Sequence, residues 1–132
     1  GNSEQETESS QYVERHGLNN NVFFLGVTTD VCRLLEIFDV FVLPSFHEGA
    51  PGSVVEAQAA NVPCILSDSI TRSVDVGTGL LKYLPLESSL QTWAEEMLRS
   101  CTMQRPNHAQ TEKKLRNAGY DIASSVQKLL KI

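Results

Sequence analysis

Two glutamates, Glu48 and Glu56, lie eight positions apart in residues 44–67, which read PSFHEGAPGSVVEAQAANVPCILS. Glu48 stands in a loop that contains glycines, and Glu56 falls in the first turns of the small-residue helix that follows. A carboxylate can accept hydrogen bonds from the two hydroxyls of a ribose. Glycines let backbone N–H groups approach a ligand, and the start of a helix attracts a phosphate. The segment therefore predicts a crevice for a sugar joined to a diphosphate.

A purely structural alternative stays open for each of these side chains. Ser53 and Glu56 match the S-x-x-E capping box, so the Glu56 carboxylate could return to the backbone N–H of Ser53. Glu48 could be a solvated loop carboxylate, as most loop glutamates are. His47 could contact a sugar hydroxyl or a phosphate, or it could stack on the protein's own surface. The residue types alone leave both the structural and the ligand-binding interpretation open for each side chain.

The sequence predicts no metal site and no cofactor. Its histidines and cysteines have no spacing that resembles a zinc or iron site. Gly77 and Gly79 resemble the start of a dinucleotide-binding G-x-G-x-x-G, but Lys82 stands where the third glycine is needed. This pair also precedes an expected strand instead of following one, which argues against that motif.

Composition places the chain among globular domains. It has 132 residues, 41% of them hydrophobic, which is enough for one domain with a core. A formal net charge of -5 and the lack of a Lys/Arg run argue against nucleic acid as a partner. Three cysteines without CxxC spacing fit a reducing, cytoplasmic compartment.

Short apolar runs alternate with segments of helical spacing along the chain. We expect strands at residues 22–25, 40–43, 63–66 and 79–84. We expect helices at about 4–16, 30–38, 50–60, 88–98 and 108–131, with Asn61 stopping the third in left-handed geometry and a break near Gly119 in the last. Ser88 is expected to cap the fourth, which would carry Leu90, Trp93, Met97 and Leu98 on one side. This order predicts an α/β fold, a Rossmann-like parallel sheet with helices on both faces, whose ligands bind beyond the carboxyl ends of the strands.

The stretch from Val22 to Leu98 resembles the donor-binding half of a GT-B glycosyltransferase of family 4, also called group 1. Residues 44–59 meet that family's pattern P-S-x-x-E-G-x-P-x-x-x-x-E-A-x-A, which contains its Glu-x7-Glu signature. Three stretches are similar to sequences of bacterial capsular and exopolysaccharide glycosyltransferases: EAQAANVPCILSD, then Ile70 and Thr71, and later GYDI at 119–122. Asn61 stands where the family usually has glycine.

The resemblance implies retaining, metal-independent transfer of a sugar from a nucleoside diphosphate sugar, most commonly a UDP-sugar, to a polysaccharide or lipid-linked acceptor. By matching position, Glu48 would be the catalytic residue, in contact with the donor sugar near the reacting carbon, and Glu56 would bind the ribose. The strand end at Gly26 would border the base. The implied donor-binding residues are Glu56, Gly49, Ala50, Pro51, Gly52, Ser53, His47 and Gly26.

The resemblance also predicts what surrounds this domain. Residues 1–132 would be a partial C-terminal nucleotide-sugar-binding domain, the truncated half of a GT-B fold, with residues 1–3 expected to be a tag remnant or disordered. The N-terminal acceptor domain and two earlier strands with diphosphate-clamping basic residues would be absent. We therefore expect an inactive fragment whose open sheet edge is rearranged or covered by a second copy in a homodimer. The full-length protein would be cytoplasmic, with peripheral contact at the inner face of the plasma membrane.

Two other classes of protein remain as alternatives. A sugar-nucleotide epimerase of GT-B shape would need catalytic acids or bases from a larger cleft. A non-catalytic flavodoxin-like or receiver module would need an early acidic cluster and an aspartate at a strand end, where residues 44–45 are instead Pro-Ser. The specific pattern of residues 44–59 favours the glycosyltransferase.

Overall fold

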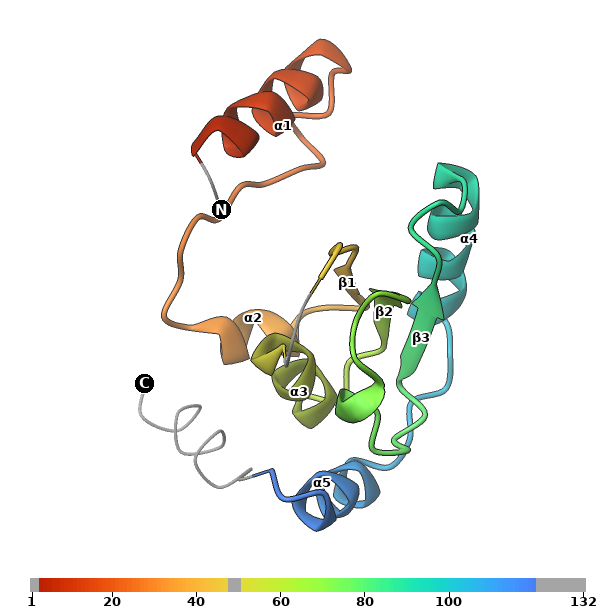
Figure 1. Cartoon of the computed structure of the whole chain (residues 1–132). Coiled ribbons are helices and arrows are strands. Elements are labelled where there is room, and N and C mark those ends of the chain that lie inside the picture. Colours follow the sequence, from red (N-terminus) through yellow and green to blue (C-terminus); the bar gives the residue numbers. More distant parts are fainter. Residues whose placement is uncertain (1–2, 48–50, 121–132) are drawn as a thin grey trace.

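The computed structural model describes residues 3–47 and 51–120, with side chains from residue 7 onward. Three strands and five α-helices with one short 3-10 helix alternate along this part of the chain (Figure 1). In order, the elements are α1 (Ser3–Arg15), α2 (Val31–Glu36), β1 (Phe41–Leu43), α3 (Gly52–Ala59), β2 (Cys64–Ser67), η1 (Arg72–Val74), β3 (Leu81–Leu84), α4 (Leu90–Cys101) and α5 (His108–Asn117). Over the described residues, the predicted strand and helix order is confirmed except at residues 22–25. Residues 121–131 of the last predicted helix, and residues 1–2 of the expected tag remnant, lie outside the described residues.

The three strands form one parallel sheet in the order β1-β2-β3. Val42 pairs with Ile65 across β1 and β2, and Ile65 pairs with Lys82 across β2 and β3. All four residues of the central strand β2 are buried, as expected for a parallel strand covered on both faces. The Rossmann-like α/β fold class is thereby confirmed.

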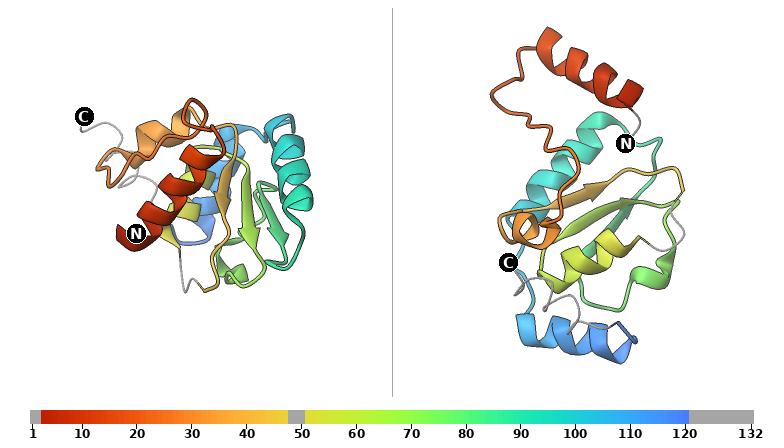
Figure 2. Two further views of the ribbon diagram at one scale, coloured as in Figure 1. Left: turned by 90° about the horizontal axis from the view of Figure 1, so that it is seen from above. Right: turned by 90° about the vertical axis from the view of Figure 1, so that its left-hand side faces the viewer.

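Helices cover both faces of the sheet, as the two views in Figure 2 show. Side chains that alternate along β2 point to opposite faces. Cys64 and Leu66 join α2 and α3 residues such as Leu35 and Ala57 in one core cluster. Ile65 joins Trp93 of α4 in a second, smaller cluster on the other face. The larger core thus lies beneath α3, the helix that carries Glu56.

The strand expected at residues 22–25 is wrong. These residues run in an extended course between α1 and α2, and they lie outside the sheet (Figure 1). Phe23 is 73% exposed and Leu25 is 59% exposed, so the run is not buried either. An apolar run becomes a strand only where a neighbouring strand satisfies its backbone, and β1 pairs with β2 alone among the described residues.

The predicted apolar side of α4 also needs correction. The helix begins one residue later than expected, because Ser89 is the N-cap and its hydroxyl accepts the Thr92 N–H at 3.1 Å. Trp93 is buried against the sheet, whereas Leu90 and Leu98 are 86% and 71% exposed. A narrow sheet of three strands covers only the stripe of the helix that holds Trp93 and Ser100.

Asn61 ends α3 in the left-handed region with φ 60°, as predicted. Its side chain does more than tolerate this geometry. The Asn61 Nδ2 donates to Pro106 O at 2.8 Å, and Thr111 Oγ1 of α5 donates to Asn61 Oδ1 at 2.9 Å. The end of α3 is therefore tied to the start of α5.

No helix in the described ranges is both long and apolar enough to cross a membrane.

Candidate functional site

The carboxyl ends of β1 and β2 are held together by one serine. Pro44 follows the last residue of β1, and Ser67 is the last residue of β2. The Ser67 hydroxyl, which is fully buried, donates a hydrogen bond to the backbone carbonyl of Ser45. This bond fixes where the chain leaves β1, just before the loop that leads to α3.

Helix α3 starts at Gly52, with Pro51 as its N-cap at φ -71°. Pro51 is buried, and no side chain caps this end of the helix. The first N–H groups of a helix have no intrahelical acceptor, so they can meet an anion. The side of Gly52 is open toward the described part of the chain, because a Cβ built there would meet none of its atoms within 4 Å.

The capping box proposed for Ser53 and Glu56 is wrong. With Pro51 at the N-cap, Ser53 lies inside the first turn and Glu56 lies at the fifth helical position. A capping box needs its acid at the third position, from which the side chain can reach back to the N-cap. Glu56 is thus too deep in the helix to cap it.

Glu56 is half buried, and its carboxylate has no hydrogen bond or ion pair with any residue that the structure describes. A carboxylate in that setting keeps its full capacity to accept hydrogen bonds. Of the acids named from the sequence, Glu56 is the one that the structure describes at the start of α3.

The other predicted site residues stand as follows. Glu48, Gly49 and Ala50 lie outside the described residues. His47 is exposed at the end of the described loop. Gly26 has φ 66° and sits in the extended segment outside the sheet, where no described contact joins it to α3.

A buried polar cluster behind α3 was not anticipated. Gln58 of α3 is 0% exposed and is hydrogen-bonded to Val74 and Thr78, which lie in the segment before β3. The only signal for it in the sequence is a glutamine within a helix of small residues, and a glutamine is expected at the surface.

Next to this cluster, an aromatic contact orders the chain that follows β2. The guanidinium carbon of Arg72 lies 3.5 Å from the centre of the Tyr83 ring, and the Tyr83 hydroxyl donates to Thr71 O at 3.5 Å. Burial, with a smaller contribution from nearby Asp75, raises the pKa of Tyr83, so its hydroxyl stays a donor. The segment after β2 is thereby fixed to β3.

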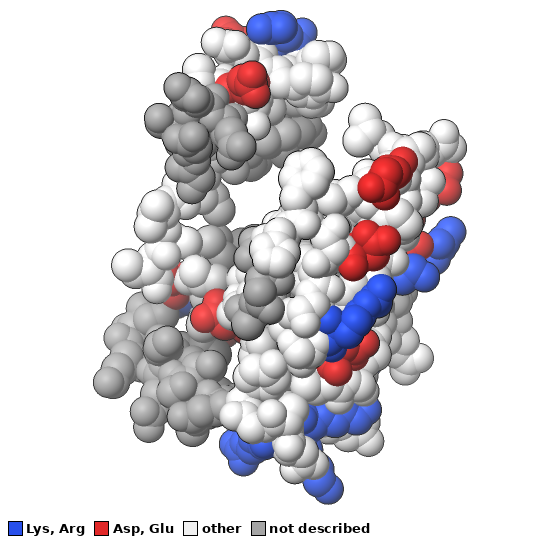
Figure 3. Space-filling model, in the orientation of Figure 1, with Lys and Arg blue, Asp and Glu red and all other residues white. Residues whose placement is uncertain are grey.

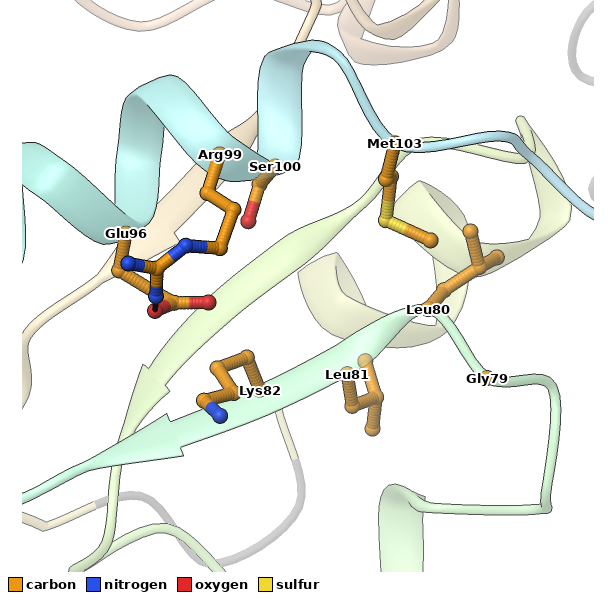
Figure 4. Close-up of a pocket in the computed structure, with 8 residues that line it drawn as sticks. All are labelled: Gly79, Leu80, Leu81, Lys82, Glu96, Arg99, Ser100 and Met103. Carbon is orange, nitrogen blue, oxygen red and sulfur yellow. Dashed lines mark hydrogen bonds and ion pairs between the residues drawn. The ribbon is translucent and has the colours of Figure 1, made fainter.

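A separate hollow of about 220 Å³ lies between the start of β3 and the second half of α4 (Figure 4). Its walls include Leu80 and Met103, and at its rim Arg99 contacts Glu96 at 2.7 Å. This is the amino end of β3, whereas Glu56 follows the carboxyl end of β1. The hollow is therefore not the predicted site.

Charges on the face seen in Figure 3 are mixed, since acidic and basic side chains lie next to one another over its upper and middle parts and basic ones lie over its lower end, at α5. The described ranges hold no group of three His, Cys, Asp or Glu side chains arranged to bind a metal ion.

Comparisons with known proteins give one consistent result. The family model described as "Glycosyl transferases group 1" matches residues 1–117. A protein of Bacillus subtilis (strain 168) named "Putative glycosyltransferase EpsF" is 40% identical over 125 residues, which are 95% of this chain and 33% of that protein. No solved structure gives a significant match.

Two further relatives match shorter stretches and carry more specific names. The Escherichia coli "UDP-Gal:alpha-D-GlcNAc-diphosphoundecaprenol alpha-1,3-galactosyltransferase" is 43% identical over 57 residues, 43% of this chain and 15% of that protein. A Campylobacter jejuni "N,N'-diacetylbacillosaminyl-diphospho-undecaprenol alpha-1,3-N-acetylgalactosaminyltransferase" is 47% identical over 47 residues, 36% of this chain and 12% of that protein. The chain thus spans a third or less of the length of these relatives.

Proposed function

The chain belongs to the group 1 glycosyltransferases, and on that basis we propose that it is the donor-binding part of an enzyme that transfers a sugar from a nucleoside diphosphate sugar. The single observation that carries this proposal is the half-buried, unpaired carboxylate of Glu56 beside the open start of α3. The parts of the site match the parts of the ligand: a carboxylate for hydroxyls and helix N–H groups for phosphates.

The diphosphate lies at the start of α3 in this proposal. Its oxygens accept hydrogen bonds from the backbone N–H groups of Gly49, Ala50, Gly52 and Ser53, of which the last two belong to described residues; Pro51 has no N–H to donate. The leaving diphosphate gathers negative charge in the transition state. Fixed N–H dipoles therefore stabilise the transition state more than the bound donor, which is how they accelerate transfer.

Glu56 binds the ribose in this proposal. Its two carboxylate oxygens accept hydrogen bonds from the 2′ and 3′ hydroxyls, which anchors the nucleoside while the sugar points toward the loop. UDP is the nucleotide that we propose, and a relative named for a UDP-galactose donor supports this choice.

Glu48 is proposed as the catalytic residue, in contact with the donor sugar near the reacting carbon. This assignment rests on its match to the first glutamate of the Glu-x7-Glu signature. Gly49, Ala50, Pro51 and His47 complete the proposed donor loop. Gly26 stays a prediction for the base, since no described contact brings it to α3.

Retention of the anomeric configuration and independence of metal ions are proposed from the same family signature. For the acceptor, we propose a lipid-linked sugar or a growing surface polysaccharide. Two relatives are named for undecaprenyl diphosphate-linked acceptors, and another for Vi polysaccharide biosynthesis. With such an acceptor, the whole enzyme would work in the cytoplasm at the inner face of the plasma membrane.

The outer edge of β1 has no strand partner among the described residues. We propose that another part of a longer protein, which includes the acceptor-binding domain and the diphosphate-clamping strands, covers it. A second copy of this chain is the alternative cover. Strand addition to this edge would satisfy the backbone groups that now face outward.

Calorimetric titration with UDP tests the proposal. The measurement uses a fusion in which residues 1–132 replace the matching third of the Bacillus subtilis relative, with Glu56→Ala as the variant and Glu87→Ala, at an exposed glutamate, as the matched control. Loss of the ribose contact should weaken UDP binding roughly 10-fold, because hydrogen bonds to a charged group are involved. Affinity in Glu56→Ala equal to that of the control would remove the ribose role.

A further inference from the structure

Gln58 is the most completely buried polar side chain on the helix that carries Glu56. It is 0% exposed and shares the buried side of α3 with Val54 and Ala57. Every other position of that buried stripe is apolar, so packing alone would be served by an apolar residue there. The amide must therefore be explained by what it binds.

Both ends of the Gln58 amide bind the segment that precedes β3. Gln58 Nε2 donates to Val74 O at 2.9 Å, and Thr78 Oγ1 donates to Gln58 Oε1 at 2.9 Å. The Thr78 hydroxyl in turn accepts the Leu80 N–H at 3.3 Å. These bonds run in one direction from Leu80 through Thr78 and Gln58 to Val74, so each polarises the next.

This chain of bonds fixes the rotation of α3 about its own axis. A van der Waals contact tolerates small rotations, whereas a planar amide held at both its oxygen and its nitrogen does not. Val74 is 1% exposed and Thr78 is 3% exposed, so water cannot replace either bond without opening the core.

Rotation of α3 matters because of where Glu56 stands. Residues two apart on a helix leave its axis about 200° apart, so Gln58 and Glu56 project on opposite sides. When α3 rotates about its axis, the Glu56 carboxylate on the other side turns through the same angle as Gln58. Displacement by about 1 Å can reduce the rate of a positioned reaction about 100-fold.

We propose that Gln58 is a positioning residue, which clamps α3 so that the Glu56 carboxylate meets both hydroxyls of the donor ribose. This proposal rests on the ribose role assigned to Glu56 above. Gln58 touches neither donor nor acceptor. Gln58 contributes by fixing the rotation of α3, which sets the direction in which the Glu56 carboxylate points.

The test compares UDP with 2′-deoxy-UDP, titrated by calorimetry into the fusion described above. Native protein should bind UDP roughly 10-fold more tightly, because the deoxy compound lacks one hydrogen bond to a carboxylate. Gln58→Met keeps the side-chain volume and removes the clamp. We expect it to lower UDP affinity about 10-fold and 2′-deoxy-UDP affinity less, because the deoxy compound has only the 3′ hydroxyl contact to lose, so that discrimination shrinks.

Three further variants keep the result interpretable. Thr78→Val removes the hydrogen bond that Thr78 donates to Gln58 Oε1, so it should reduce the discrimination between the two nucleotides less than Gln58→Met does. If Gln58→Met does not fold, Thr78→Val is the variant that tests the proposal. Thr111→Val loosens the far end of α3 instead and should leave discrimination intact. Combining Gln58→Met with Glu56→Ala should cost no more UDP affinity than Glu56→Ala alone.

Equal losses for both nucleotides in Gln58→Met, or equal loss of discrimination in Thr111→Val, would overturn the positioning role and leave Glu56 as the ribose ligand. Native protein that binds both nucleotides equally would overturn the ribose role of Glu56 itself, and with it the role of Gln58. The two failures are therefore distinguishable.

Discussion

Asn61 and Thr111 are joined by a 2.9 Å hydrogen bond between Asn61 Oδ1 and Thr111 Oγ1, although 50 positions separate them in the chain. Asn61 ends the helix that carries Glu56, and Thr111 lies in α5. The bond makes α5 a support for the back of the proposed donor site.

The two duties of Asn61 can be separated by substitution. Asn61→Gly keeps the φ of 60° without strain and loses both side-chain hydrogen bonds, so the free energy of unfolding should fall by about 1–2 kcal/mol. Asn61→Ala loses the same bonds and also places alanine, which tolerates left-handed backbone less well than asparagine or glycine does, at this φ, so it should cost roughly 1 kcal/mol more than Asn61→Gly. Urea denaturation of both variants measures the difference. Equal stability of Asn61→Gly and the native chain would show that the bonds contribute nothing.

Gly52→Ala should separate folding from binding. A Cβ at Gly52 meets no atom of a described residue within 4 Å, and alanine favours a helix over glycine by up to about 1 kcal/mol. The variant should therefore be as stable as the native chain or more so. If a diphosphate lies against this backbone, the methyl group takes its place, and UDP affinity should fall roughly 10-fold. Thermal unfolding and calorimetry measure the two effects. Unchanged affinity would place the diphosphate elsewhere.

Cys64 and Cys101 should differ sharply in reactivity. Burial raises the pKa of the Cys64 thiol to about 12 from an ordinary 9.0, whereas Cys101 is exposed. At pH 8 a thiol reagent should label Cys101 quickly and Cys64 only as the chain unfolds. Labelling of Cys64 in the native Cys101→Ser variant at the rate of a free thiol would contradict this burial.

The same shift gives a pH dependence of stability. Between pH 9 and about 12 the unfolded chain loses the Cys64 proton while the folded chain keeps it. The contribution of the buried thiol is therefore fully present below pH 9 and is lost as the pH rises toward 12. The free energy of unfolding of Cys64→Ala should fall less over this range than that of the native chain, as denaturation curves at several pH values would show.

Glu48→Ala should change turnover and leave nucleotide binding intact. In our proposal Glu48 contacts only the donor sugar, so the UDP affinity of the fusion described above should stay near its native value. The release of UDP from a UDP-sugar by the same fusion, measured with membranes that carry acceptor, should fall at least about 100-fold. Glu87→Ala, at an exposed glutamate outside the proposed site, is the control and should leave turnover near the native value. Native turnover in Glu48→Ala would end the catalytic assignment.

Local patterns predicted most of the fold. Pro44 ends β1, Asn61 stops α3 and the apolar run at Cys64–Ser67 is a buried strand, because each depends on the residue's own conformational preference or on its immediate neighbours. Residues 22–25 have an equally strong strand pattern, but a strand also needs a partner, and the partner is not a local property.

The candidate site was predictable only in part for a similar reason. The position of Glu56 on α3 follows from the sequence, whereas its lack of a capping role depends on Pro51 taking the N-cap. Gln58 was missed because its partners Val74 and Thr78 stand 16 and 20 positions away. Contacts across such separations are set by packing, which the spacing of residue types does not reveal.

The place where UDP binds on the chain tests the proposed donor site most directly. Addition of UDP to the ¹⁵N-labelled chain, followed by amide chemical shifts, should perturb Gly52, Ser53 and Glu56 at the start of α3 most strongly. The hollow lined by Leu80 and Met103 provides an internal control at the other end of β3, and its amides should stay unchanged. Shifts confined to that hollow, with none at the start of α3, would contradict the proposed donor site.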